Sequence, residues 1–107
     1  MLPLIWAVGM VDLLPYPDQP LDVDWLCDFF RSARAGSWRG AVTRDPGEIL
    51  DEADLIYRYH WATRNAELYG EPAPAALDRG VVMERHHALN WLIGYGDAPW
   101  DKVTCDT

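Results

Sequence analysis

Apolar positions recur along the chain with the spacing of helices, and the clearest such segment begins at Asp45. An Asp can accept hydrogen bonds from the first helical amides, and Pro46 behind it suits a first helical position. Glu48, three residues after Asp45, completes the pattern of a capping box. The spacing that follows predicts a helix to about Tyr69, with Gly70 as its stop.

This segment carries apolar residues on two sides when they are placed about 100° apart. We therefore expect it to be the central helix, with others packed on both sides. The wide face contains Ile49, Leu50, Ala53, Ile56, Tyr57, His60, Trp61 and Leu68, and the narrower stripe contains Leu55, Tyr59, Ala62 and Ala66.

Three further segments have helical spacing. The first runs from Pro3 to about Leu14 and is apolar on nearly every side, which predicts burial all round. The second runs from Asp22 or Asp24 to Ala35, and the last from Asp78 or Gly80 to Ile93. Irregular structure is expected in the connectors 15–20, 36–44 (with Trp38) and 71–76, and in the tail 97–107, which Trp100 would anchor.

These elements predict an all-α fold. No strand pattern or internal repeat is present, and half of the 107 residues are hydrophobic, which is enough to build one core. We expect a single helical domain over residues 1–107, arranged as a compact bundle of about four helices with an irregular C-terminal tail.

The net charge limits the classes of partner that the chain is expected to bind. Seventeen acidic residues against nine Lys and Arg give a net charge of −8, so a nucleic-acid backbone would be repelled. The acidity can serve solubility alone, or it can complement a basic partner protein. The apolar run from Leu2 to Val11 is too short to span a membrane and lacks a basic start, so we expect no membrane association.

The two cysteines fit no metal spacing and are expected to be free thiols in the cytoplasm. Cys27 stands among apolar residues and is expected in the core, whereas Cys105 lies near a polar chain end and is expected to be more exposed.

Arg85 is the most informative polar residue, because it falls in the middle of the last helix's apolar face. A buried charge is costly unless it is paired. We expect Asp51 or Asp54 to pair with Arg85, and Arg58 to pair with Glu84. The pattern suits either a structural ion-pair network or a ligand-binding arginine.

Other candidate chemistry is weaker. Glu84 and His87 have the Glu-x-x-His spacing of di-iron bundles, but one copy supplies too few ligands, so no metal is expected. His60 lies on an apolar face and suits a core histidine better than a general base. Nucleotide-binding, hydrolase and metalloprotease signatures are absent, so no cofactor is expected. The candidate polar cluster is Asp51, Asp54, Arg58, His60, Glu84, Arg85 and His87.

Three stretches, EILDEADLIYRYHWA (48–62), VVMERHHALNWLIGY (81–95) and WDKVTCDT (100–107), resemble the C-terminal half of the bacterial "domain of unknown function 4272" family, as does IWAVGMVDLLPYP (5–17). The resemblance implies a helical fold, a bacterial origin and longer relatives with an added N-terminal helical region. It implies no activity. Residues recurrent in the family map onto Asp51, Asp54, Arg58, His60, Trp61, Glu84, Arg85, Asn90, Trp91, Trp100, Asp101 and Thr107.

The sequence leaves three hypotheses for function. The first is a protein-interaction or self-association module, which binds a second copy or an unidentified, possibly basic, protein through a wide surface patch. The second is a small-ligand-binding protein or a metal-dependent enzyme that uses the polar cluster in a closed pocket. The third is a structural fragment of a larger protein.

Overall fold

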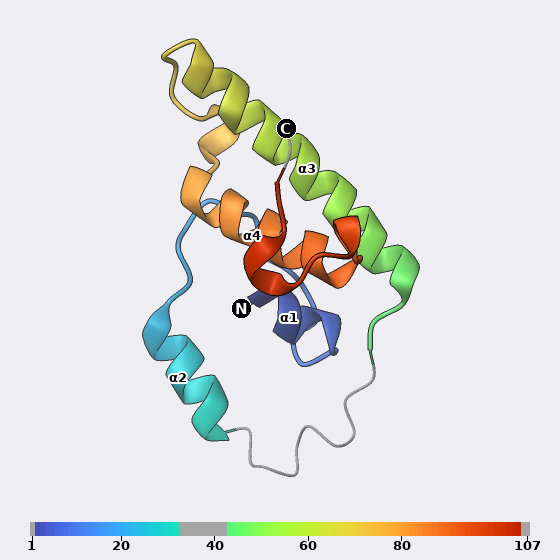
Figure 1. Cartoon of the computed structure of the whole chain (residues 1–107). Helices are drawn as coiled ribbons and strands as arrows, with labels where there is room; N and C mark the ends of the chain where they lie inside the picture. The colour runs from blue at the N-terminus through green and yellow to red at the C-terminus, as the bar shows by residue number, and fades with distance from the viewer. Residues whose placement is uncertain (1, 33–42, 106–107) are drawn as a thin grey trace.

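The computed structural model describes residues 2–32 and 43–105 of the chain (Figure 1). These residues form helices and no strand, so the predicted all-α fold of about four helices with an irregular tail is confirmed. The predicted linker around Trp38 and the end of the second predicted helix lie outside the described residues. The elements are α1 (Leu2–Ala7), α2 (Val23–Ser32), α3 (Pro46–Leu68) and α4 (Arg79–Leu92), with 3-10 turns η2 (Pro74–Ala76), η3 (Tyr95–Asp97) and η4 (Trp100–Lys102).

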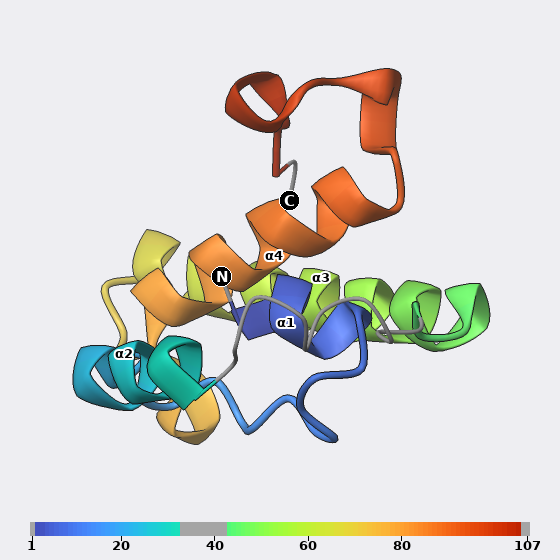
Figure 2. The ribbon, with the colours of Figure 1, turned by 90° about the horizontal axis from the view of Figure 1, so that it is seen from below.

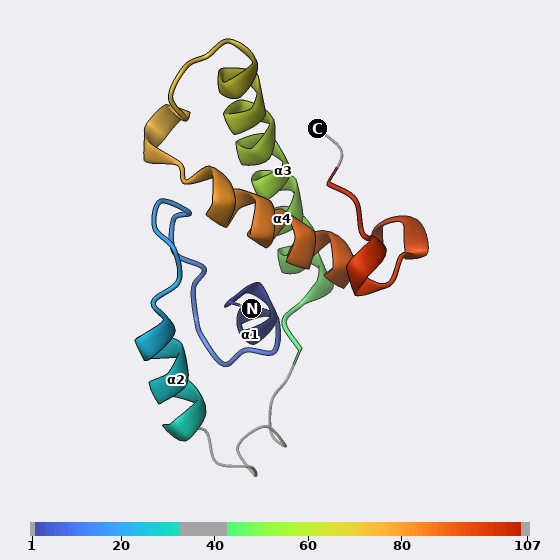
Figure 3. The ribbon, with the colours of Figure 1, turned by 60° about the vertical axis from the view of Figure 1, so that its left-hand side comes forward.

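The core lies where α3, α4 and α1 meet. Helix α4 crosses α3 and packs most extensively against it, and α1 packs against α4 (Figure 3). The expectation that the third predicted helix is central was therefore wrong, because α4 is the helix that packs against both of the other core helices, α3 and α1. Helix α3 instead leaves part of its wide apolar face exposed. The core residues are Trp6, Ala7, Ile49, Ala53, Ile56, Leu77, Val82 and Leu89.

The ends of α3 follow the sequence signals closely. The Asp45 carboxylate accepts a hydrogen bond from the Gly47 amide at 3.0 Å. Glu48 does not close the expected capping box, because its carboxylate pairs with Arg44 at 3.4 Å instead. At the other end Gly70 has a φ of +67°, the left-handed conformation that stops a helix at a residue without a Cβ.

Helix α4 is delimited in a similar way. The Asp78 carboxylate accepts from the amide of Val81 at 3.0 Å and caps the first turn. The helix ends at Leu92, and Gly94 follows it in the left-handed conformation. The predicted boundaries of this segment are correct within two residues.

Helix α1 is shorter than the sequence pattern predicts. It ends at Ala7, and Gly9 follows with a φ of +77°. The amides of Gly9 and Met10 bond back to the carbonyls of Trp6 and Ile5, which is the paired arrangement that terminates many helices. The burial predicted for this segment holds within the helix, whereas Leu13 beyond it is exposed.

Helix α2 lies apart from the α3–α4 pair (Figures 1 and 3). Asp22 caps it by accepting from the Asp24 amide at 2.9 Å. The helix makes no contact with another described element comparable to the packing of α3, α4 and α1. Cys27, expected in the core, is therefore exposed, while Cys105 is partly buried.

Candidate functional site

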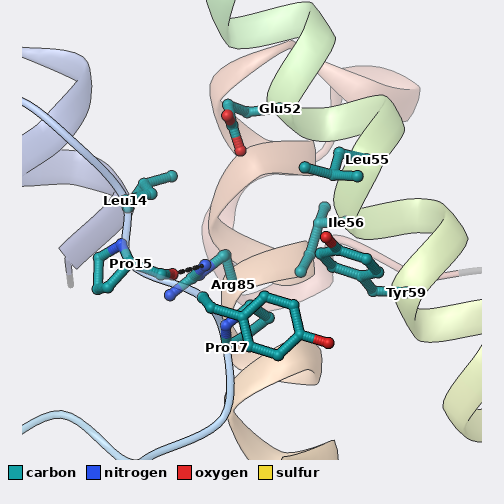
Figure 4. A pocket seen from close by; sticks show the side chains of 9 residues that line it. Leu14, Pro15, Pro17, Glu52, Leu55, Ile56, Tyr59 and Arg85 are labelled. Atoms are coloured by element: carbon teal, nitrogen blue, oxygen red, sulfur yellow. Dashed lines mark hydrogen bonds between the residues drawn. The ribbon is translucent and has the colours of Figure 1, made fainter. Parts of the chain in front are cut away.

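Arg85 occupies the middle of α4 and is only 8% exposed. Its Nη1 donates a hydrogen bond to the carbonyl oxygen of Pro15 at 2.7 Å (Figure 4). The partner is thus a backbone group from the connector between α1 and α2. This corrects the expectation that Asp51 or Asp54 pairs with Arg85.

The connector that Arg85 holds is fixed at two further points. The Tyr16 hydroxyl donates to the carbonyl of Ala75 at 2.6 Å, and the Tyr16 ring meets the Tyr59 ring edge to face at 5.8 Å. The amide of Asp78 donates to the carbonyl of Pro17 at 2.9 Å, and Pro17 is buried. The segment around Tyr16 is therefore held against α3, η2 and the start of α4. We call residues 14–17 the strap.

A cavity of about 180 Å³ lies between the strap and α3, and Arg85 lines it. Its walls are mostly apolar and aromatic, while Glu52 points into it from α3 above the guanidinium (Figure 4). Glu52 and Arg85 face the same cavity without forming an ion pair with each other. We call this the Arg85 cavity; its other lining residues include Leu14, Tyr16, Leu55, Ile56 and Tyr59.

Electrostatics follow from this burial. Removal from water lowers the pKa of the Arg85 guanidinium, and the nearby Glu52 and Tyr59 partly offset that by raising it. A guanidinium keeps its proton through such a change, so Arg85 remains a fixed positive charge. The Arg85 cavity thus contains one cation, one carboxylate and an apolar wall.

A second cavity of about 200 Å³ lies on the other side of the strap and also reaches Arg85. Its polar lining includes Asp22 and Glu84, and Glu84 is exposed. The two cavities therefore differ in charge, with more acidic groups in the second.

Three members of the predicted polar cluster stand on the surface of α3. Asp51, Asp54 and Arg58 are all exposed. Arg58 pairs with Asp54, one helical turn away, at 3.0 Å. The expected pair between Arg58 and Glu84 is therefore not formed. Exposed pairs of this kind contribute little to stability.

His60 is buried at the α3–α4 interface, as the sequence indicates for a core histidine. Its Nδ1 lies 2.7 Å from Nδ1 of His86, which is also buried. One nitrogen must donate and the other accept, so the pair can hold this geometry only while at least one ring is neutral. Burial, and to a lesser degree the charge of Arg64, lower the pKa of His60.

His87 lies on a different side of α4 from His86. Its Nε2 forms a hydrogen bond with the carbonyl of Trp100 at 2.7 Å, and the two rings are in contact. The predicted anchoring of the tail by Trp100 thus includes His87. The seven cluster residues are consequently distributed over the strap cavities, the histidine pair, the tail contact and the outer surface of α3.

Sequence reasoning missed Glu52, Tyr59 and His86. Glu52 and Tyr59 follow the narrower apolar side of α3, which the strap covers, but nothing in the sequence showed which segment would cover it. His86 adjoins His87 in the sequence but points in a different direction, and this divergence lets His86 meet His60.

Within residues 2–32 and 43–105, no group of three or more His, Cys, Asp or Glu side chains is placed to hold a metal ion. In the same residues, no helix has the length and apolar content needed to cross a membrane.

The family model described as "Domain of unknown function (DUF4272)" matches residues 1–103. The chain belongs to this family. The match extends from α1 through η4, so the DUF4272 region includes α2, the strap and the Arg85 cavity. No curated protein and no solved structure is significantly similar to this DUF4272 member.

Proposed function

We propose that this DUF4272 member is a self-association module, in which the apolar face of α2 docks onto an exposed stripe of α3 in a second copy. The observation that carries the proposal is the apolar face of the amphipathic helix α2, on which Val23, Trp25 and Phe30 are exposed.

The α2 face is well defined. Successive residues placed about 100° apart put its acidic residues on one side and its apolar residues on the other. Trp25 stacks on Phe29 with ring centroids 5.5 Å apart, and Phe29 meets Phe30 edge to face at 5.6 Å. Val23, Trp25 and Phe30 are nevertheless exposed. Such a contiguous aromatic patch is typical of a protein–protein contact.

A matching surface exists on α3. Leu50, Tyr57, Trp61 and Leu68 share one side of the helix and are all exposed. We call these four residues the α3 stripe. Its length is that of several helical turns, so it can accept a short helix such as α2 along its axis.

A second copy of this chain is the occupant that we propose, because it supplies both the α2 face and the α3 stripe. Asp24 and Asp28 lie on the side of α2 opposite its apolar face and are exposed, so they would stay in solvent when that face docks. A two-fold pairing would form the α2–α3 contact twice, once in each direction. Burial of the exposed apolar residues in both contacts would oppose the repulsion between two chains that each carry a net charge of −8.

The test is the mass of the protein in solution between about 1 and 200 μM, measured by sedimentation equilibrium. We expect a dimer of the 12.2 kDa chain, and monomers for Phe30→Glu and for Trp61→Glu. Leu13→Glu, which adds the same charge at an exposed apolar residue outside both surfaces, should remain dimeric. A parent that is monomeric throughout would overturn the proposal, as would equal loss of dimer in Leu13→Glu.

Mixing the two monomeric variants separates this geometry from other dimers. Trp61→Glu keeps an intact α2 face, and Phe30→Glu keeps an intact α3 stripe, so the mixture can form one of the two contacts. We expect a weak heterodimer between them, while each variant alone stays monomeric. No heterodimer at the highest concentration would contradict docking of α2 on the α3 stripe.

A further inference from the structure

The Arg85 cavity lies on a different side of α3 from the stripe, so self-association leaves it free. We propose that the Arg85 cavity binds a free α-amino acid with an apolar side chain. The ligand's carboxylate would bind Arg85, its ammonium group would bind Glu52, and its side chain would contact Leu14, Leu55 and Tyr59.

The carboxylate position follows from the unused donors of Arg85. A guanidinium has five N–H donors, and within the described residues its one hydrogen bond is the one from Nη1 to Pro15. The residue as a whole is 8% exposed, and its guanidinium lines the cavity. A buried cation of this kind is stabilised by a carboxylate, which accepts two parallel hydrogen bonds from a guanidinium.

The ammonium position follows from Glu52. This carboxylate is half-buried and points into the cavity above the guanidinium (Figure 4). It would repel a ligand that carried a carboxylate alone. A ligand with a carboxylate and an ammonium group attached to the same carbon atom could satisfy both Arg85 and Glu52, and an α-amino acid has that arrangement.

The volume and the lining of the Arg85 cavity determine which ligand side chain would fit. The cavity volume of about 180 Å³ corresponds to about six water molecules at ~30 Å³ each, which suits a molecule of amino-acid size. Leu14, Leu55 and Ile56 supply an aliphatic wall, and the rings of Tyr16 and Tyr59 supply an aromatic one. An apolar side chain would be removed from water against these groups.

The second cavity is the poorer site for the same ligand, although Arg85 also reaches it. Asp22 and Glu84 contribute two carboxylates there, and both belong to exposed residues. They would repel the ligand's carboxylate more than the single Glu52 does. The geometry therefore favours the side of the strap that faces α3.

The experiment is isothermal titration calorimetry of the full chain with three probes of matched shape. L-Leucine carries both charges, 4-methylpentanoate lacks the ammonium group, and 3-methylbutylamine lacks the carboxylate. We expect L-leucine to bind, and each analogue to bind at least ~10-fold more weakly, since each leaves one charged group of the cavity unpaired.

Variants assign the two contacts. Glu52→Gln and Arg85→Lys should each weaken L-leucine binding by about 10-fold or more, whereas Asp51→Asn and Arg58→Lys, on the outer surface of α3, should not change it. Glu52 is on a helix surface, so Glu52→Gln should fold even if a change at Arg85 does not.

Three results would overturn the proposal. The first is that the folded parent does not bind L-leucine at concentrations up to about 10 mM. The others are equal affinity for 4-methylpentanoate and L-leucine, and an unchanged affinity for L-leucine in Glu52→Gln. None of these depends on the mass of the protein. The failure of this proposal is therefore distinguishable from the failure of self-association.

Discussion

The Nδ1 atoms of His60 and His86 lie 2.7 Å apart across the α3–α4 interface, and both residues are buried. The rings are nearly perpendicular, with centroids 5.0 Å apart. Two protonated rings would place two donors against each other at this distance. The contact that joins the two main helices is therefore sensitive to protonation.

This pair predicts that stability falls as the pH falls. The pKa of His60 is lowered from its ordinary value of 6.5, chiefly by burial and also by Arg64. The unfolded chain therefore takes up a proton first as the pH drops, so the stabilisation is complete above about pH 6.5 and is lost progressively below it. Urea unfolding between pH 8 and 5.5 should show a slope of at most about 1.4 kcal/mol per pH unit from this residue.

The variant His60→Asn should flatten that dependence, because it removes the titrating group and keeps a polar atom near Nδ1. His87→Asn is the matched control, since His87 contacts Trp100 outside the buried pair. It should keep the pH dependence of the parent. A slope that is the same in His60→Asn and in the parent would contradict this account.

The α3–α4 core should be sensitive to loss of volume. Leu89 is fully buried in α4, whereas Leu13 in the connector is 79% exposed. Leu89→Ala should lower the free energy of unfolding by about 2–5 kcal/mol, because it leaves a cavity, and Leu13→Ala should change it by less than about 0.5 kcal/mol. Urea midpoints at an unchanged m value would measure both. Equal effects would indicate that Leu89 is not part of a packed core.

The Arg85 side chain should contribute less than a buried ion pair would. Among the described residues its hydrogen bond goes to the carbonyl of Pro15, so Arg85→Met should cost about 1.5–3 kcal/mol, the range for a bond with one charged partner. Arg58→Met, which breaks only an exposed pair with Asp54, should cost less than about 1 kcal/mol. A loss of 3–5 kcal/mol in Arg85→Met would instead indicate that a buried carboxylate had been left unpaired.

The fold was predictable where local signals decide it. The carboxylates of Asp45 and Asp78 and the glycines after α3 and α4 fixed both long helices within about two residues. Local signals failed for α1, where Gly9 ended the helix before its apolar pattern did. They also failed for α2, since an amphipathic pattern indicates which face prefers burial but not whether another element covers it.

The candidate site was less predictable for a related reason. Helical spacing predicted that Arg85 is buried, but it offered as partners only side chains on other predicted helices. The actual partner, the Pro15 carbonyl, is 70 residues away in a connector and has no sequence signal of its own. For the same reason the sequence did not predict the strap, which together with Glu52, Tyr59 and Arg85 lines one cavity.

Arg44 provides the last prediction, because it ties the start of α3 to α1. Its Nε donates to the Trp6 carbonyl at 3.0 Å and its Nη2 to the Val11 carbonyl at 2.9 Å, while the guanidinium lies 4.5 Å from the centre of the Trp6 ring. A lysine cannot reproduce this forked, stacked arrangement. Arg44→Lys should therefore lower the free energy of unfolding by about 2–3 kcal/mol.

The matched control is Arg31→Lys, since Arg31 has an exposed side chain that pairs with the exposed Asp28, one turn away. It should change the stability by less than about 0.5 kcal/mol. Hydrogen exchange gives a local readout of the same change. The amides of residues 8–10 donate hydrogen bonds to carbonyls in α1. They should exchange faster in Arg44→Lys than in the control, because the C-terminal end of α1 loses hydrogen bonds from Arg44. If Arg44→Lys lowers the free energy of unfolding but leaves the exchange of residues 8–10 unchanged, Arg44 acts on α3 alone through its pair with Glu48.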